Sequence, residues 1–151
     1  MPTIIGHEWS GTICELGSDI PANLDLHPGQ KCVVFPVLGD RTCLYCQQSL
    51  HGACPNWGFL GYSGIAGGFS EYSCIDARDI VPIPDDMDLD VAALVEPLAV
   101  GWHAVKSSGV QADDSVLVMG AGPIGIAVVL SLQAMGVGNI SVAEVSALRS
   151  E

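Results

Sequence analysis

Four potential metal ligands stand close together in the sequence: Asp40, Cys43, Cys46 and Cys54. Two residues separate Asp40 from Cys43 and Cys43 from Cys46, a spacing that lets a loop wrap around one tetrahedral ion. Zinc prefers thiolate sulfur and accepts carboxylate oxygen, so this set predicts a closed structural zinc site with one oxygen and three sulfurs. His51 is an alternative fourth ligand, and three unrelated thiols are the alternative without a metal.

A second group of candidate ligands begins with His7 and Glu8. A histidine beside a glutamate is by itself more typical of a structural hydrogen bond than of a metal site. Glu96, however, lies in the otherwise apolar run VEPLAVGWHAV. A buried carboxylate has a large solvation cost unless it is paired or bound to a cation. His7, Glu8 and Glu96 are therefore candidate ligands of a catalytic metal.

The third feature is the stretch SVLVMGAGPIGIAVVLSLQAMGVGNISVAE, residues 115–144. Its β-branched run at residues 116–119 predicts a buried strand. The pattern G-x-G-x-x-G follows at residues 120–125, and residues 124–135 have the length and composition of a helix packed on a sheet. A second apolar run at residues 140–143 predicts another strand. This order of elements predicts a dinucleotide-binding β-α-β unit.

The glycine turn has a physical reason at each position. Gly120 permits the tight turn, Gly122 lets a pyrophosphate approach the backbone, and Gly125 lets helix and strand pack closely. Pro123 starts a helix whose unpaired amides and dipole attract phosphate. Glu144, about 20 residues beyond Gly125, is placed to accept hydrogen bonds from the adenosine ribose, which favours NAD over NADP. The predicted cofactor contacts are Gly120, Gly122, Pro123, Ile124, Gly125 and Glu144.

Composition narrows the class of protein. The uncharged run at residues 116–141 is long enough for a membrane span, but its glycines, its proline, Gln133 and the absence of flanking Lys or Arg favour the β-α-β unit. The formal net charge of −12 repels nucleic acid and anionic lipid, so neither is an expected partner. The start, MPTIIGHEW, has neither a basic region nor an apolar signal core, so a cytoplasmic location is expected. Cys14, Cys32 and Cys74 are predicted to be inert buried thiols.

The elements that carry these residues fall into two parts. Residues 1–84 contain strand-like runs at 8–16, 31–36 and 69–75, with a turn at 27–30. Residues 85–151 begin with helices: Asp88 is a candidate N-cap for residues 89–95, and a second helix is predicted at 98–107, after Pro97. The predicted fold class is α/β with a β-rich part.

The chain resembles the zinc-dependent medium-chain dehydrogenase/reductases of the alcohol dehydrogenase superfamily. The resemblance lies in four motifs that occur in this order: Gly6-His7-Glu8, the cysteine cluster, Glu96-Pro97-Leu98-Ala99 and the glycine turn. The segments GFLGYSGIAGGFSEY and ALVEPLAVGWHAV look most like the polyol branch, especially sorbitol and (R,R)-butanediol dehydrogenases. The resemblance covers essentially the whole chain. It implies a GroES-like catalytic domain lacking its start at residues 1–84, then linker helices and the N-terminal half of an NAD-binding Rossmann domain at 85–151.

The resemblance also implies roles. His7 and Glu8 match the G-H-E ligands of the catalytic zinc, and Glu96 matches the glutamate of E-P-L-A, which ligates that zinc or lies beside it. The family normally has four cysteines in a zinc-binding lobe, and Asp40 stands where the first of them is expected. The implied reaction is hydride transfer between a secondary alcohol or polyol and NAD, with zinc polarising the substrate oxygen. Homo-oligomers are expected for the full-length family.

The family's catalytic cysteine lies upstream of the G-H-E motif, and a complete Rossmann sheet has about six strands. We therefore expect this chain to be the middle of a longer enzyme, with little turnover of its own. One alternative is a non-catalytic truncated paralogue that acts as a zinc-binding or subunit-interaction module with exposed apolar surface. Another is a zinc-free quinone-reductase-like relative, which is disfavoured because such relatives usually lack both the cysteine lobe and the G-H-E pair.

Overall fold

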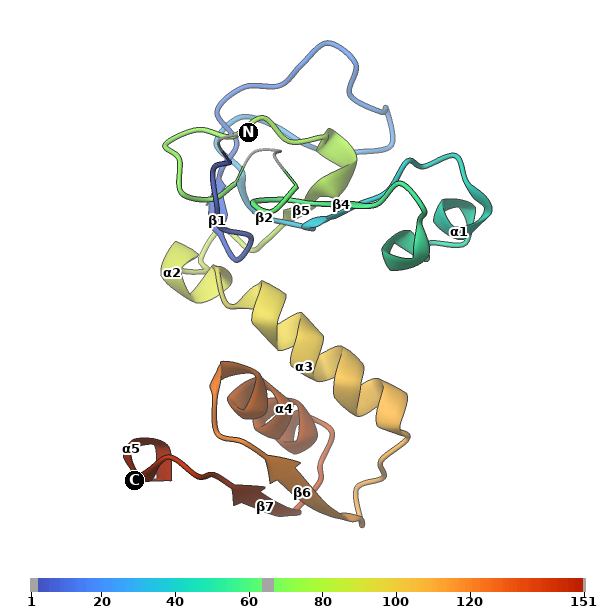
Figure 1. Cartoon of the computed structure of the whole chain (residues 1–151). Coiled ribbons are helices and arrows are strands. Elements are labelled where there is room, and N and C mark those ends of the chain that lie inside the picture. Colours follow the sequence, from blue (N-terminus) through green and yellow to red (C-terminus); the bar gives the residue numbers. More distant parts are fainter. Residues whose placement is uncertain (1–2, 64–66, 151) are drawn as a thin grey trace. The chain divides into compact units, whose positions relative to one another are not determined.

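The computed structural model describes residues 3–63 and 67–150. These residues form two compact units, Met1–Leu94 and Val95–Glu151 (Figure 1). The first unit is built from short strands and loops, and the second from helices and one pair of strands. No helix in the described ranges is both long enough and apolar enough to cross a membrane.

The first unit is centred on an antiparallel sheet of three strands, in the order β1 (Ser10–Thr12), β2 (Lys31–Val34) and β5 (Ile80–Pro82). Strand β2 lies in the middle, and its Cys32, Val33 and Val34 are all buried because neighbours cover them on both sides. The predicted turn before it is formed, since the Gln30 N–H donates to the His27 carbonyl. Gly29 has a positive φ of 89°, a conformation that favours glycine.

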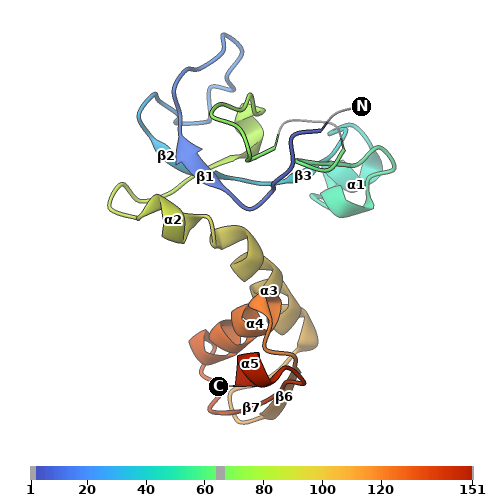
Figure 2. The same ribbon diagram turned by 60° about the vertical axis from the view of Figure 1, so that its left-hand side comes forward.

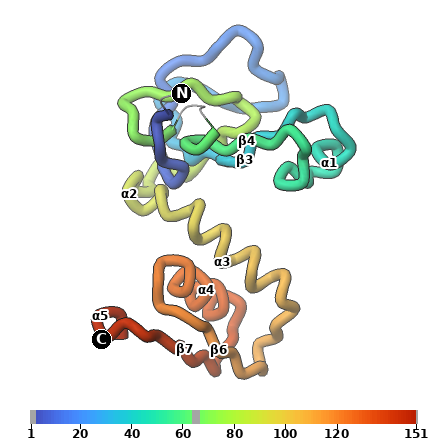
Figure 3. The backbone as a smooth tube through the Cα atoms, viewed as in Figure 1, coloured from blue at the N-terminus to red at the C-terminus, as the bar shows by residue number. Residues whose placement is uncertain are grey.

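Two further strands frame a lobe within the first unit. Strand β3 (Val37–Leu38) pairs with β4 (Gly58–Phe59), and the chain between them carries helix α1 (Leu44–Gln47) and the 3-10 helix η1 (His51–Ala53). Figure 3 shows the chain leaving these paired strands and returning to them. We call residues 39–57 the lobe.

Three sequence-based predictions for this unit are wrong. Only Ser10–Thr12 of the run at 8–16 is a strand, and residues 69–75 form none. Phe69 and Tyr72 are more than three-quarters exposed, so this segment lacks the packing that stabilises a strand. Cys14 and Cys74 are exposed rather than buried, whereas Cys32 is buried as predicted.

Helix α2 (Leu89–Ala92) belongs to the first unit, which ends at Leu94. The Asp88 carboxylate caps α2 as predicted by accepting from the N–H groups of Asp90 and Val91. Two side chains of the sheet hold this segment: the Ser10 hydroxyl donates to the Leu89 carbonyl at 2.6 Å, and the Lys31 ammonium donates to the Met87 carbonyl at 2.7 Å. The helix ends three residues before the predicted end at residue 95.

The second unit contains a β-α-β arrangement. Strands β6 (Ser115–Met119) and β7 (Asn139–Ala143) are parallel, and helix α4 (Pro123–Ala134) connects them. Helix α4 packs against β6 and against α3 (Val95–Ser108), as Figures 1 and 2 show. The short helix α5 (Ala147–Ser150) follows β7. The buried core consists of Val105, Val118, Leu132 and Val137.

The predicted strand-turn-helix-strand order is confirmed, with boundaries that agree within one residue. Helix α3, by contrast, starts at Val95 rather than at 98. Pro97 lies in the first turn, where the N–H that proline lacks would have had no partner within the helix, so it does not delay the helix start. Gly101 allows close packing, because a Cβ there would lie 2.6 Å from the backbone carbon of Ala127 in α4.

Candidate functional site

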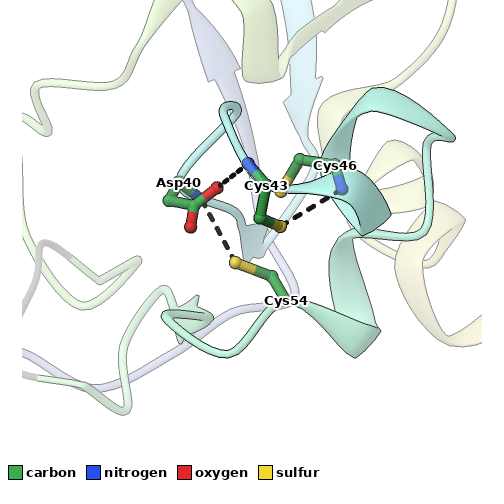
Figure 4. Close-up of side chains that lie close together, drawn as sticks. All are labelled: Asp40, Cys43, Cys46 and Cys54. Carbon is green, nitrogen blue, oxygen red and sulfur yellow. Dashed lines mark hydrogen bonds between the residues drawn. The ribbon is translucent and has the colours of Figure 1, made fainter.

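The four predicted zinc ligands of the lobe are brought together. One ligand atom from each of Asp40, Cys43, Cys46 and Cys54 lies within 4.8 Å of all the others, although the residues span two turns and two short helices (Figure 4). Among the described residues this group includes Asp40 and does not include His51. Three sulfurs and one oxygen form a donor set that suits zinc.

Hydrogen bonds hold these donors in place without an ion. The Asp40 Oδ1 accepts from the N–H groups of Thr42 and Cys43, both at 2.9 Å, and its Oδ2 accepts from the Asn56 amide at 3.0 Å. The Cys54 Sγ accepts from the Asp40 N–H at 3.4 Å. The Cys43 Sγ caps helix α1 by accepting from the Cys46 N–H, also at 3.4 Å. The residues present therefore fit a zinc ion.

The protonation states of the lobe follow from these contacts. Hydrogen bonds from the backbone N–H groups of Cys43 and Thr42, and from the Asn56 side chain, hold the pKa of Asp40 well below its usual range. Burial raises the pKa of the Cys46 thiol to about 12. A thiol that coordinates a cation loses its proton, so metal binding by this lobe releases protons.

Gly39 sets how closely the chain approaches the cysteines. A Cβ at this position would lie 2.6 Å from the Cys46 sulfur and 2.9 Å from the His51 Nδ1. The His51 ring packs edge-on against Phe35, with 6.0 Å between ring centroids. Glycine is therefore needed at position 39 for the sulfur of Cys46 to reach the donor group.

An ion pair that sequence reasoning missed joins the lobe to the sheet. The Arg41 guanidinium donates from Nη2 to the Asp79 Oδ2 at 2.6 Å, and Asp79 is only 4% exposed. Asp79 ends the 3-10 helix η2 (Ala77–Asp79), immediately before β5. The sequence did offer one signal that Arg41 matters. The chain has only five Lys and Arg in total, and one of them stands between Asp40 and Cys43.

His7 and Glu8 also lie in the first unit, beside a cavity of about 350 Å³. The His7 ring packs edge-on against Phe59, with 5.0 Å between centroids. Gly61 borders the same cavity, and a Cβ there would collide with the Gly6 backbone. Glu96 belongs to the second unit and lies in the first turn of α3, where the helix dipole favours a carboxylate.

The glycine turn of the second unit has the predicted geometry. Gly120 has a φ of 105°, and a Cβ on Gly125 would collide with the Gly120 carbonyl oxygen. Gly122 is the N-cap of α4 with no side-chain cap, and no atom lies within 4 Å of the place its Cβ would take. Pro123 occupies the first turn. The first N–H groups of α4 have no partner within the helix and no side-chain cap, which is the arrangement that binds phosphate.

Glu144 follows β7 and is held by the protein itself. Its carboxylate accepts from the Ala121 N–H at 2.8 Å, the Ser146 N–H at 2.7 Å and the Arg149 Nε at 3.0 Å. Arg149, and then the two N–H groups, lower the pKa of Glu144 to about 2. Its side chain is only 6% exposed. The contact between Arg149 and Glu144 was not predicted from the sequence, because it depends on helix α5, which brings Arg149 back toward the end of β7.

Comparison with known proteins identifies the family. Residues 1–85 match the alcohol dehydrogenase GroES-like domain, and the chain therefore belongs to this family. It is 37% identical over 167 residues to the (R,R)-butanediol dehydrogenase of Saccharomyces cerevisiae, covering 100% of this chain and 42% of the relative. The expected family and the GroES-like part of the predicted fold class are thereby confirmed.

Solved structures agree with this assignment. The crystal structure of 2R,3R-butanediol dehydrogenase from Bacillus subtilis matches with a TM-score of 0.87 and 36% identity, over 99% of this chain and 41% of that one. A short chain alcohol dehydrogenase from Escherichia coli CFT073, complexed with the cofactor NADH, matches with a TM-score of 0.87 and 31% identity. The match covers 96% of this chain and 42% of that one. The chain thus spans about two-fifths of the length of these relatives.

Proposed function

We propose that this chain is the zinc-binding and nucleotide-binding part of a dehydrogenase that transfers hydride between a secondary alcohol or polyol and NAD. The single observation that carries this proposal is the preformed group of Asp40, Cys43, Cys46 and Cys54 in a GroES-like unit. The relatives named above include butanediol dehydrogenases, which supports a small alcohol bearing a second hydroxyl as the substrate.

In this proposal His7, Glu8 and Glu96 hold the catalytic zinc. When bound, zinc supplies a Lewis acid that lowers the pKa of the substrate hydroxyl. The His7 ring lies beside the cavity, and Phe59 helps to fix the plane of that ring through the edge-on contact. The ring orientation of a histidine ligand matters because its second nitrogen must keep a hydrogen-bonding partner.

The glycine turn would bind the dinucleotide. The amides at the start of α4 face the pyrophosphate, and the uncrowded Gly122 allows its approach. The Glu144 carboxylate, which stays ionised at neutral pH, accepts from the hydroxyls of the adenosine ribose. The proposed contacts remain Gly120, Gly122, Pro123, Ile124, Gly125 and Glu144.

Metal analysis and calorimetry test this function directly. We expect purified chain to retain zinc after dialysis, and we expect titration with NAD to give binding that the Glu144→Ala variant weakens about tenfold, the loss of roughly one charge-assisted hydrogen bond. Oxidation of butane-2,3-diol, followed by the appearance of NADH, should be close to background for this chain alone, and clear turnover would contradict the expectation of little activity. A chain that binds neither zinc nor NAD would contradict the proposal.

A second candidate function is a non-catalytic zinc-binding or subunit-interaction module. The face of β6 that points away from α4 supports it, because Leu117 is 61% and Met119 is 85% exposed. Such apolar surface is typical of an interaction site. Metal content separates the two candidates: a single zinc that is lost in Cys46→Ser but kept in His7→Ala favours the module.

A further inference from the structure

The turn that carries Asp40 contains an arginine in an unfavourable backbone conformation. Arg41 has a φ of 59°, in the left-handed region, where the Cβ of an L-residue crowds the following carbonyl oxygen. Glycine adopts this conformation without that crowding. Among the described residues only Ser49 shares this property of a positive φ in a residue other than glycine. A strained residue of this kind persists only where the surrounding structure fixes it.

The side chain of Arg41 supplies that fixation. Its Nη2 donates to the Asp79 carboxylate at 2.6 Å, and its Nε lies 3.9 Å from the Asp76 carboxylate. The side chains are 24% exposed for Arg41 and 6% for Asp79, so the pair is largely shielded from water. The remaining nearby arginine, Arg78, is half-exposed and bonds to Asp76.

Asp79 is itself part of the sheet framework of the first unit. Its carbonyl accepts from the Phe35 N–H at 2.8 Å, directly after β2, and its own N–H donates to the Asp76 carbonyl at 2.9 Å. In the ranges 3–63 and 67–150, Arg41 is the only residue recorded as donating a hydrogen bond to the Asp79 side chain. The ion pair therefore connects the turn of the lobe to the β2–β5 framework, across 38 positions of sequence.

The conformation of Arg41 decides where the metal donors lie. The Asp40 Oδ1 reaches the N–H groups of Thr42 and Cys43 only if the chain turns sharply at Arg41, the residue that follows Asp40. The N–H of Asp40, at the start of the same turn, donates to the Cys54 sulfur. The conformation at Arg41 thus sets how Asp40 is placed relative to Thr42 and Cys43.

We propose that Arg41 is a positioning residue for the metal site of the lobe. Its ion pair with Asp79 holds the Asp40–Cys43 turn in the left-handed conformation, so the carboxylate and the three sulfurs are arranged before the ion arrives. Binding a preformed site loses less conformational entropy than ordering a loose one. This inference rests on the metal site proposed above, but the tether itself exists in the metal-free chain.

Four variants separate the tether from the strain. Arg41→Gly relieves the torsional strain and removes the ion pair, Asp79→Asn removes the charge with little change of shape, and Arg41→Lys keeps the charge on a shorter donor. Arg78→Ala is the matched control, because it removes an arginine from the same acidic cluster without touching Asp79.

The measurement is titration with Co²⁺, whose absorption bands report bonds to thiolate, followed by competition with Zn²⁺ and a chelator. We expect Asp79→Asn to bind about tenfold more weakly, at the lower end of the losses seen for residues that orient metal ligands. Arg41→Gly should lose less, because glycine adopts the positive φ without strain. Arg41→Lys should recover part of this loss, and Arg78→Ala should lie within about twofold of the unaltered chain. Asp79→Asn binding as tightly as the unaltered chain would overturn the proposal.

Amide hydrogen exchange in the metal-free chain gives a second readout. We expect the Cys43 and Cys46 amides to exchange about tenfold faster in Asp79→Asn, while the Val33 amide of β2 reports that the sheet remains folded. If the unaltered chain binds neither Co²⁺ nor Zn²⁺, the proposed metal site fails, and exchange still decides whether the tether exists. Unchanged exchange in Asp79→Asn would refute the tether even if Arg41→Gly does not fold.

Discussion

The lobe around Asp40 and the glycine turn around Gly122 are both predicted to bind a ligand, but they are built in different ways. The lobe gathers four side chains and holds them with side-chain hydrogen bonds and the Arg41–Asp79 ion pair. The turn presents backbone amides and depends on positions where no side chain intrudes. A site made of side chains should be sensitive to the loss of single donors, and a site made of backbone should be sensitive to added atoms.

The largest expected effect is the loss of a sulfur from the lobe. Cys46→Ser should weaken zinc binding at least about 100-fold, above the range caused by residues that only orient ligands. Competition with a chelator measures this loss. Cys14→Ser is the control, because Cys14 is exposed and lies outside the donor group. NAD binding should be unchanged in both variants, and a loss of NAD binding in Cys46→Ser would contradict the difference between the two regions.

The next largest effect is expected when a methyl group is added to the glycine turn. Gly125→Ala places a Cβ against the Gly120 carbonyl oxygen and should lower the free energy of unfolding of the second unit by about 1–3 kcal/mol, the usual cost of overpacking. Urea unfolding followed at this unit measures it. Gly138→Ala is the matched control: its Cβ meets no atom within 4 Å, so it should change stability by less than about 0.5 kcal/mol. Equal effects of the two substitutions would contradict the close packing.

A smaller effect separates the two tasks of Asp40. Asp40→Asn keeps an oxygen that accepts from the Thr42 and Cys43 amides, so the turn should remain ordered while metal affinity falls. Asp40→Ala loses the acceptor as well and should make opening of the turn easier by about 1 kcal/mol, as for other residues that cap backbone amides. Amide exchange of Thr42 and Cys43 measures the difference. Equal exchange in both variants would show that the carboxylate does not order the turn.

The smallest effect concerns pH and Glu144. Its pKa is lowered from 4.5 in the unfolded chain to about 2 by Arg149 and two N–H groups. Its contribution to stability is therefore complete above the unfolded value and is lost as the pH falls from 4.5 through about 2. Unfolding by urea at several pH values in this window should show a steeper decline for the unaltered chain than for Glu144→Gln. Parallel curves would mean that the contacts of Glu144 do not stabilise the folded unit.

Local sequence predicted the second unit better than the first. The elements β6, α4 and β7 were predicted within one residue, because the glycine pattern and the apolar runs encode them over short distances. Asp88 was likewise identified as a helix cap from its position alone. The run at residues 69–75 was misread as a strand, because a strand requires a partner that local sequence does not reveal.

The candidate metal site shows the same division. Spacing alone selected Asp40, Cys43, Cys46 and Cys54, and left open whether Asp40 or His51 completes the group. The folded chain groups Asp40 with the three sulfurs. The Asp40 carboxylate is fixed by the Thr42 and Cys43 amides, while the His51 ring packs on Phe35. The rarity of basic residues could have drawn attention to Arg41, but local sequence does not pair it with Asp79, which lies 38 positions away.

The sequence by itself determined the type of each ligand and the shape of the glycine turn. Both follow from covalent chemistry and short-range sterics: sulfur and carboxylate bind cations, and glycine alone permits a positive φ and a close backbone approach without strain. Only the tertiary structure decided which donors converge and how Glu144 and Arg41 are held. Those outcomes depend on contacts between distant segments, whose energies are set by burial and by the partners that folding brings within hydrogen-bonding distance.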